Sequence, residues 1–86
     1  MSARWLAYYE ERHESALRGY HAETDPGHRA ANAHAQLAYW RDEIALAEPD
    51  CRILVRTTAA FWAALVATER AAAELRLTFL LARSAA

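Results

Sequence analysis

The chain has 86 residues and a formal net charge of −1, and 55% of its residues are hydrophobic. A chain of this length forms one small domain with a marginal core, so we expect an oligomer or a bound partner to complete it. The near-neutral charge excludes a global basic field that would attract nucleic acid. Residues 1–50 hold five arginines and nine acids, whereas residues 51–86 hold five arginines and two acids. This asymmetry favours a head-to-tail or antiparallel contact between copies.

The only cysteine, Cys51, excludes an internal disulfide and a thiolate metal cluster, and a reducing cytosol is its natural compartment. The N-terminus lacks a secretory pattern, because the first apolar residues are followed at once by residues 10–12, which are all charged. The longest run without charge, from Thr57 to Thr68, falls short of the ~20 apolar residues that span a bilayer. We therefore expect a soluble, cytoplasmic protein with no membrane partner.

Two breaks divide the chain, at Thr24–Gly27 and at Glu48–Asp50. Proline fits the first turn of a helix, and Thr24 or Asp25 can cap the helix after the first break, as Asp50 can after the second. The breaks and the helical apolar periodicity predict helices at about residues 3–23, 27–48 and 50–83 of a single domain, 1–86. Short connections make neighbouring helices antiparallel, so the expected fold is all-α, a three-helix up-down-up bundle with an extended third helix.

The third helix carries two apolar stripes, and it is longer than its neighbours can cover. At ~1.5 Å per residue it spans roughly 50 Å, against about 30 Å for each of the other two, so an overhang begins near Ala72. The first stripe, which we expect to face the bundle, consists of Cys51, Leu54, Thr58, Phe61, Leu65, Thr68, Ala72, Leu75 and Phe79. The second stripe consists of Val55, Trp62, Val66, Ala73, Leu77 and Leu80.

An uncovered apolar overhang on a soluble chain predicts a partner, either a second copy or another protein. The alternative is a helix that bends or stops near Glu74, which lets the tail fold back. The predicted partner-binding residues are Leu75, Leu77, Phe79, Leu80 and Leu81, with Arg76 and Arg83 on the rim and with Trp62 and Val66 added if the second stripe faces outward.

The predicted function is therefore a non-enzymatic protein–protein interaction: a self-assembling subunit, an adaptor, or an inhibitor that occupies another protein's site. A compact chain of this kind also suits a phage or mobile-element protein. No glycine-rich phosphate loop and no strand–turn–helix serine elbow is present in the sequence. Cys51 near a helix N-terminus is better explained as a buried, inert thiol than as a nucleophile. No cofactor is expected.

Two alternative functions use polar residues. Five arginines of the third helix, Arg52, Arg56, Arg70, Arg76 and Arg83, can contact phosphates, which makes nucleic-acid association the first alternative. The second is a divalent-metal site around the first break. Two imidazoles and two carboxylates fall within eight residues there, and such side chains ligate Zn²⁺ and similar ions: His21, Glu23, Asp25 and His28. A polar turn between two helices explains the same four residues without metal.

Two further histidines lie at or beside inner positions of the predicted helices. Glu10 and His13 have the Glu-x-x-His spacing of di-iron bundles, but a second such pair is missing, so a hydrogen-bonded interior histidine is the better interpretation. His34 and Glu69 lie about one turn apart in level, and a buried contact between them would make the packing sensitive to pH. A partly exposed His34 is the preferred interpretation.

Overall fold

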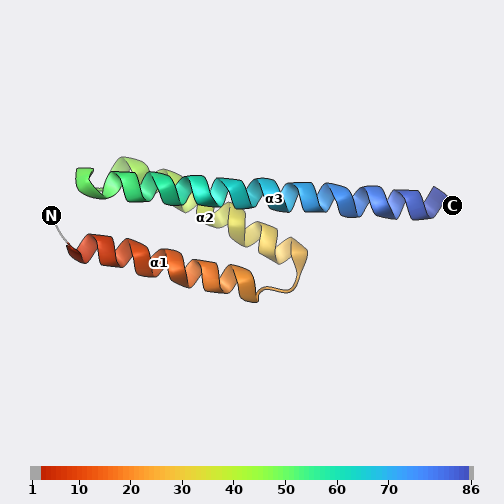
Figure 1. Ribbon diagram of the computed structural model, residues 1–86, viewed down its shortest axis with the longest axis horizontal. Helices are drawn as coiled ribbons and strands as arrows, with labels where there is room; N and C mark the ends of the chain where they lie inside the picture. Colours follow the sequence, from red (N-terminus) through yellow and green to blue (C-terminus); the bar gives the residue numbers. More distant parts are fainter. Residues whose placement is uncertain (1–2, 86) are drawn as a thin grey trace.

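The protein was analysed as a computed structural model that describes residues 3–85, and the regular structure of that range is entirely helical (Figure 1). It consists of α1 (Ala3–Ala22), α2 (Pro26–Leu46), a short 3₁₀ turn η1 (Pro49–Cys51) and α3 (Arg52–Ala85). The predicted all-α class is confirmed, and each helix begins and ends within a few residues of its predicted bounds.

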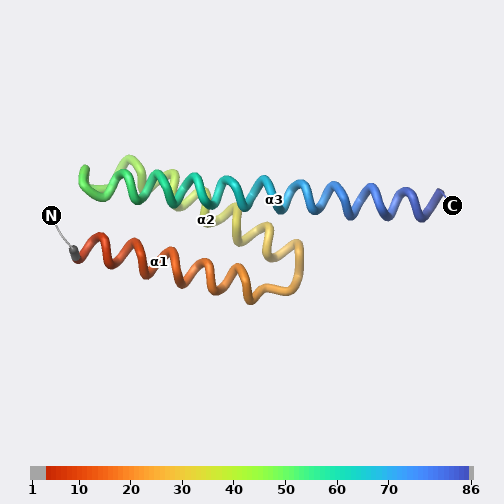
Figure 2. Tube along the Cα trace, viewed as in Figure 1, coloured from red at the N-terminus to blue at the C-terminus, as the bar shows by residue number. Residues whose placement is uncertain are grey.

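The path of the chain leaves the C-terminal part of α3 alone (Figure 2). α1 and α3 run in the same direction, and α2 runs back and passes behind α3 in this view, but α3 continues well past the turn that joins α1 to α2. The molecule consequently measures 61 × 22 × 13 Å, with a radius of gyration of 16.3 Å. A compact chain of this length would have a radius of gyration of about 12 Å. The overhang therefore dominates the shape, and α3 is continuous rather than folded back near Glu74.

Local chemistry accounts for both breaks. Asp25 caps α2 as predicted, because its carboxylate accepts a hydrogen bond from the backbone N–H of His28 at 2.9 Å and Pro26 occupies the first turn. α2 stops where Ala47 adopts an extended conformation, two residues before Pro49. The predicted cap by Asp50 is wrong: Asp50 lies inside η1, whose first position follows Glu48 without any side-chain capping bond.

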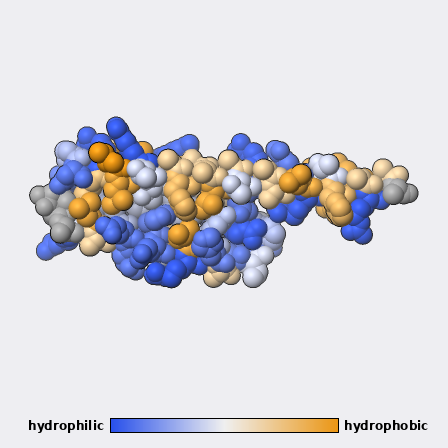
Figure 3. All heavy atoms as spheres, in the orientation of Figure 1, coloured by the Kyte–Doolittle hydropathy of each residue, from blue (hydrophilic) through white to orange (hydrophobic). Residues whose placement is uncertain are grey.

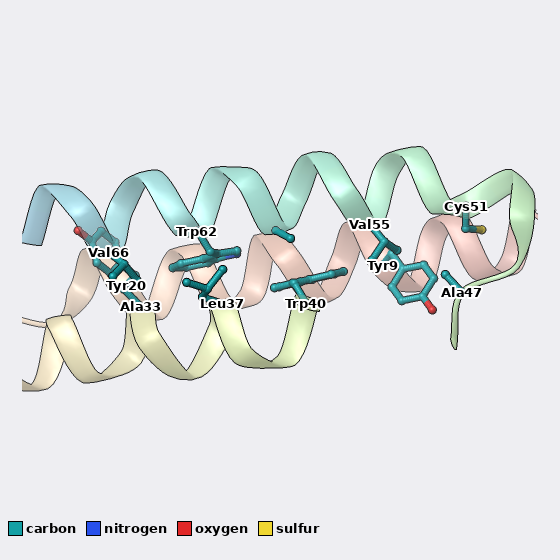
Figure 4. Packing of buried hydrophobic residues seen from close by; sticks show 11 residues of the cluster. Tyr9, Tyr20, Ala33, Leu37, Trp40, Ala47, Cys51, Val55, Trp62 and Val66 are labelled. Carbon is teal, nitrogen blue, oxygen red and sulfur yellow. The ribbon is translucent and has the colours of Figure 1, made fainter. Parts of the chain in front are cut away.

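The core lies between α2 and the first half of α3, and two tryptophans form its centre (Figure 4). Trp40 of α2 and Trp62 of α3 are fully buried, as are Cys51 and Val55. The two helices approach closely because small residues such as Ala33 on α2 separate them. Thr58 is also buried here, and its hydroxyl donates to the Leu54 carbonyl within α3, so no polar group is left unsatisfied at this position.

α1 is attached through long aromatic side chains rather than by close backbone approach. Tyr9 is buried against Trp40, and its hydroxyl donates a 2.8 Å hydrogen bond to Glu43. Burial together with this bond to a carboxylate raises the pKa of Tyr9 to about 12. Tyr20, near the other end of α1, is buried edge-on against Trp62.

The stripe of α3 that faces the bundle differs from the prediction. The buried residues are Val55, Thr58, Ala59, Trp62, Val66 and Glu69: three come from the second stripe, Thr58 comes from the first, and Ala59 and Glu69 belong to neither. Phe61, which we expected inside, is 38% exposed, because the larger indole of Trp62 fills the space between α1 and α2. The indole N–H of Trp62 also donates to Nδ1 of His13 at 3.1 Å, which fixes its orientation inward. Thr68, Leu75 and Phe79 of the first stripe are exposed.

Candidate protein-binding site

The last buried residue of α3 is Glu69, and it marks the level at which the other helices end. Its Oε2 accepts a hydrogen bond from the Tyr20 hydroxyl at 2.5 Å and another from Nε of Arg29 at 2.9 Å. Tyr20 closes α1 and Arg29 lies in the first turns of α2, so one carboxylate binds all three helices together. Beyond Ala72, every described residue of α3 is exposed.

The Glu69 carboxylate is held in its charged form. The hydrogen bond from Tyr20 lowers the pKa of Glu69, and the nearby Arg29 guanidinium and Arg76 lower it further, against the opposing effect of burial. The same contacts act in reverse on Tyr20, because burial and the adjacent carboxylate raise the pKa of its hydroxyl. We call the part of the molecule in which the three helices pack together the body. This charge-assisted cluster stabilises the end of the body, and α3 continues past it without a neighbour.

The continuation, residues 73–85, is called the tail here, and it displays large apolar side chains in water. All five predicted contact residues are more than half exposed: Leu75 (71%), Leu77 (58%), Phe79 (64%), Leu80 (56%) and Leu81 (62%). Figure 3 shows the tail projecting beyond the body, with hydrophobic atoms along much of its visible face. Scattered apolar residues are common on protein surfaces, but five within seven positions leave apolar side chains exposed on more than one side of an isolated helix.

Two rows of side chains run from the core directly onto the tail. In the first row, at intervals of seven residues, buried Val66 is followed by Ala73 and then by Leu80. The inclusion of Trp62 and Val66 in the binding surface is therefore wrong, because both are buried inside the chain's own core at 0% and 6% exposure. The rows that contain them reach the surface only beyond Glu69, where the packed part of the three helices ends.

The second row places arginines among the tail's apolar side chains. Trp62 and Glu69 are followed at the same interval by Arg76 and Arg83. The Arg83 guanidinium carbon lies 6.0 Å from the centre of the Phe79 ring, at the limit of a cation–π contact. A shallow hollow, almost wholly apolar, is lined by Leu75, Arg76, Phe79 and Leu80. The tail thus combines an apolar surface with a positively charged rim.

A second exposed apolar pair, at the other end of α3, was missed by sequence reasoning. Leu46, the last residue of α2, is 76% exposed, and Ile53, in the first turn of α3, is 79% exposed. Their position in the sequence could have indicated their exposure, because both lie beside the Glu48–Asp50 break, where a helix end leaves its side chains with fewer neighbours. Periodicity alone gave no reason to place them outside.

The predicted metal ligands are not assembled into a site. His28 Nδ1 lies 3.6 Å from a carboxylate oxygen of Asp25 and 3.8 Å from one of Glu23, and His28 is largely exposed. Within the range that the structure describes, no three His, Cys, Asp or Glu side chains are grouped so that they could hold a metal ion. His21 is exposed and stacks edge-on against Tyr20. The arrangement is that of a polar turn capped by Asp25.

The interior histidine and the other polar candidates are also placed. His13 is half-buried, receives the Trp62 hydrogen bond and lies edge-on to Phe61, as expected for a hydrogen-bonded interior residue. Burial lowers the pKa of His13. His34 is exposed, in line with the preferred interpretation, and the alternative contact with Glu69 is not formed, because Tyr20 and Arg29 bind that carboxylate instead.

Cys51 and the arginines of α3 fit structural roles. The Cys51 side chain is fully buried, and burial raises the pKa of its thiol, which opposes formation of a reactive thiolate. Arg52 donates to the Ala47 carbonyl at 3.3 Å, next to the end of α2. Arg56, in the first half of α3, and Arg70, just past its middle, are exposed and lie outside the tail. Nucleic-acid association through these side chains stays a prediction.

The segment Pro49–Ala85 is long and apolar enough to cross a membrane, judged by length and composition alone. Core helices of soluble proteins meet the same criterion, and the first half of this segment is packed against α2. Its longest uncharged stretch, Thr57–Thr68, covers only about 18 Å of a hydrocarbon core that is ~30 Å thick.

No family model matches the chain, and no curated protein or solved structure was found to resemble it.

Proposed function

We propose that this protein is a non-enzymatic interaction protein whose α3 tail binds another protein. The observation that carries the proposal is the exposure of five large apolar side chains on a helix that leaves its own body at Glu69. An amphipathic helix of this kind fits an apolar groove on a partner, as an adaptor or an inhibitor requires. The tail occupies about 20 Å of helix, which is sufficient for three to four turns of contact.

The chemistry of the tail describes the groove that would receive it. Leu77 and Leu80 extend the face that is buried in the body, so they are the natural anchors of a helix laid into a hydrophobic groove. Arg76 and Arg83 flank these anchors and favour carboxylates on the rim of the groove. Burial of each leucine stabilises a complex by roughly 1.5–3 kcal/mol, so the pair supplies a large part of a micromolar affinity.

The test is capture of partners by immobilised protein, with the double variant Leu77→Ser/Leu80→Ser compared against the wild type. We expect the double variant to bind any captured partner at least 100-fold more weakly, because two buried leucines contribute more than about 3 kcal/mol to the binding free energy. Far-UV circular dichroism should show that the double variant keeps its helicity.

The matched control is Leu46→Ser/Ile53→Ser, which removes a similar exposed apolar area from the other end of the molecule. Equal loss in the two double variants would indicate nonspecific adhesion of apolar surface and would reject the proposal. Unfolding of the Leu77→Ser/Leu80→Ser variant would also reject it, because the tail would then belong to the core of the single chain.

A further inference from the structure

The face of α3 that points away from α1 and α2 carries no charged residue along its whole length. This outward face contains one residue every three or four positions, and all are exposed: Ile53, Thr57, Ala60, Ala64, Ala67, Ala71, Leu75, Thr78 and Ala82. The solvent side of an amphipathic helix is ordinarily polar and charged. A run of more than seven turns without charge is therefore unexplained by the single chain.

The two ends of the outward face are apolar, and the stretch between them is built from small residues. At the N-terminal end Ile53 lies on the face, beside Leu46 of α2, and at the C-terminal end Leu75 lies on it, flanked by Phe79 and Leu81. Small side chains in the middle allow another helix to approach to roughly 8 Å between axes. We propose that the outward face is covered by α3 of a second copy of this chain, running antiparallel about a two-fold axis.

The charges beside the outward face favour the antiparallel direction. Arg56 and Glu74 are 18 residues apart, which is five turns of an α-helix, so they lie on the same edge of α3. Both are exposed, and neither forms an ion pair within the part of the chain that the structure describes. Two antiparallel copies place the edges that carry Arg56 and Glu74 on the same side of the contact and bring Arg56 of each against Glu74 of the other, whereas parallel copies related by a two-fold axis place these edges on opposite sides, so the pairs cannot form.

The register set by this pairing also matches the ends of the helix. Its midpoint is Leu65, so Leu75 of one copy comes within one turn of Ile53 of the other, and the flanking Phe79 and Leu81 reach the level of η1. Arg83 of one copy then lies level with Ala47 of the other, next to the carboxylate-bearing Glu48. Each apolar end thus covers the opposite end of the second helix, and the symmetric contact is closed rather than open-ended.

This dimer covers Leu75, Phe79 and Leu81 but leaves free the two leucines that anchor the docking function proposed above. Leu77 and Leu80 continue the buried face of α3, on the side opposite to the outward face, so they stay accessible in the dimer. Variants of the two surfaces therefore report on different contacts, and either contact can be absent without the other.

The test is sedimentation velocity across a wide range of concentrations at low ionic strength. The wild type should form dimers, and Arg56→Glu alone or Glu74→Arg alone should raise the dissociation constant about tenfold, because each converts two attractive pairs into repulsive ones. The double exchange Arg56→Glu/Glu74→Arg should restore dimerisation. Arg70→Glu is the control, because in this register Arg70 faces Ala60 rather than a charged residue.

The contrary results are distinct. A wild type that stays monomeric at millimolar concentration overturns the dimer, and a double exchange that does not recover overturns the register. An equal effect of Arg70→Glu would also overturn the register. The Leu77→Ser/Leu80→Ser variant should dimerise as the wild type does, so loss of partner capture without loss of the dimer separates the two proposals.

Discussion

Val66 and Leu80 offer a direct comparison of the body with the tail, because they lie on the same row of α3 but differ in surroundings. Val66 is 6% exposed in the core, and Leu80 is 56% exposed on the tail. Val66→Ala removes two buried methyl groups, at about 0.8 kcal/mol each, and leaves a cavity, so it should lower the free energy of unfolding by roughly 1.5–3 kcal/mol. For a domain of this size, that corresponds to a fall in melting temperature of at least about 6 °C.

Leu80→Ala removes more atoms but should change the free energy of unfolding by less than about 0.5 kcal/mol, because those atoms are largely exposed, border only other residues of the tail, and alanine favours the helix. Urea unfolding followed by far-UV circular dichroism and by tryptophan fluorescence measures both changes. The measurement should be repeated at two protein concentrations. A cost at Leu80 equal to that at Val66, at both concentrations, would refute the conclusion that the cooperative body ends at Glu69.

Two further predictions concern hydrogen-bonded side chains. Glu69→Gln should lower the free energy of unfolding by about 1.5–3 kcal/mol, because the charged acceptor shared by Tyr20 and Arg29 is lost. Urea titrations measure this change, and an unchanged free energy of unfolding would contradict a stabilising role for these hydrogen bonds. Burial lowers the pKa of His13 below 6.5, and protonation of its Nδ1 removes the acceptor of the Trp62 hydrogen bond. The contribution of His13 to the free energy of unfolding should therefore be fully present above pH 6.5, and it should be lost as the pH falls from 6.5 through the lowered pKa of the folded state. Melting temperatures between pH 8 and pH 5 test this, and His13→Gln should flatten the profile; an equally steep profile in that variant would assign the effect elsewhere.

Much of the fold could be predicted from the sequence because the residues at the breaks between helices determine where the helices begin and end. Pro26 and Pro49 fix where helices begin, and the carboxylate of Asp25 caps α2 as its position indicates. The length of α3 follows from the absence of Pro and Gly after Asp50, so the exposed tail was also predictable. The residues of the tail are those named from the sequence, although their role in binding is a proposal.

The orientation of α3 was not predictable in the same way, because two apolar stripes lay side by side. Phe61 and Trp62 are adjacent, and the choice between them depends on which one fills the space between two other helices. The hydrogen bond from Trp62 to His13 joins residues 49 positions apart, so no local pattern reports it. The binding of Glu69 by Tyr20 and Arg29 is likewise long-range, and only the assembled helices show that it displaces a contact with His34.

The manner in which α1 is attached has a consequence for the order in which the molecule opens. α2 and α3 are joined by close backbone approach, whereas α1 is held mainly by a few long side chains that end in bonds such as that from Tyr9 to Glu43. Loss of these anchors frees one helix while the α2–α3 hairpin remains. Amide hydrogens of α1 should therefore exchange with solvent by an opening that costs less than global unfolding, and Trp40 and Trp62 become accessible to water in that state.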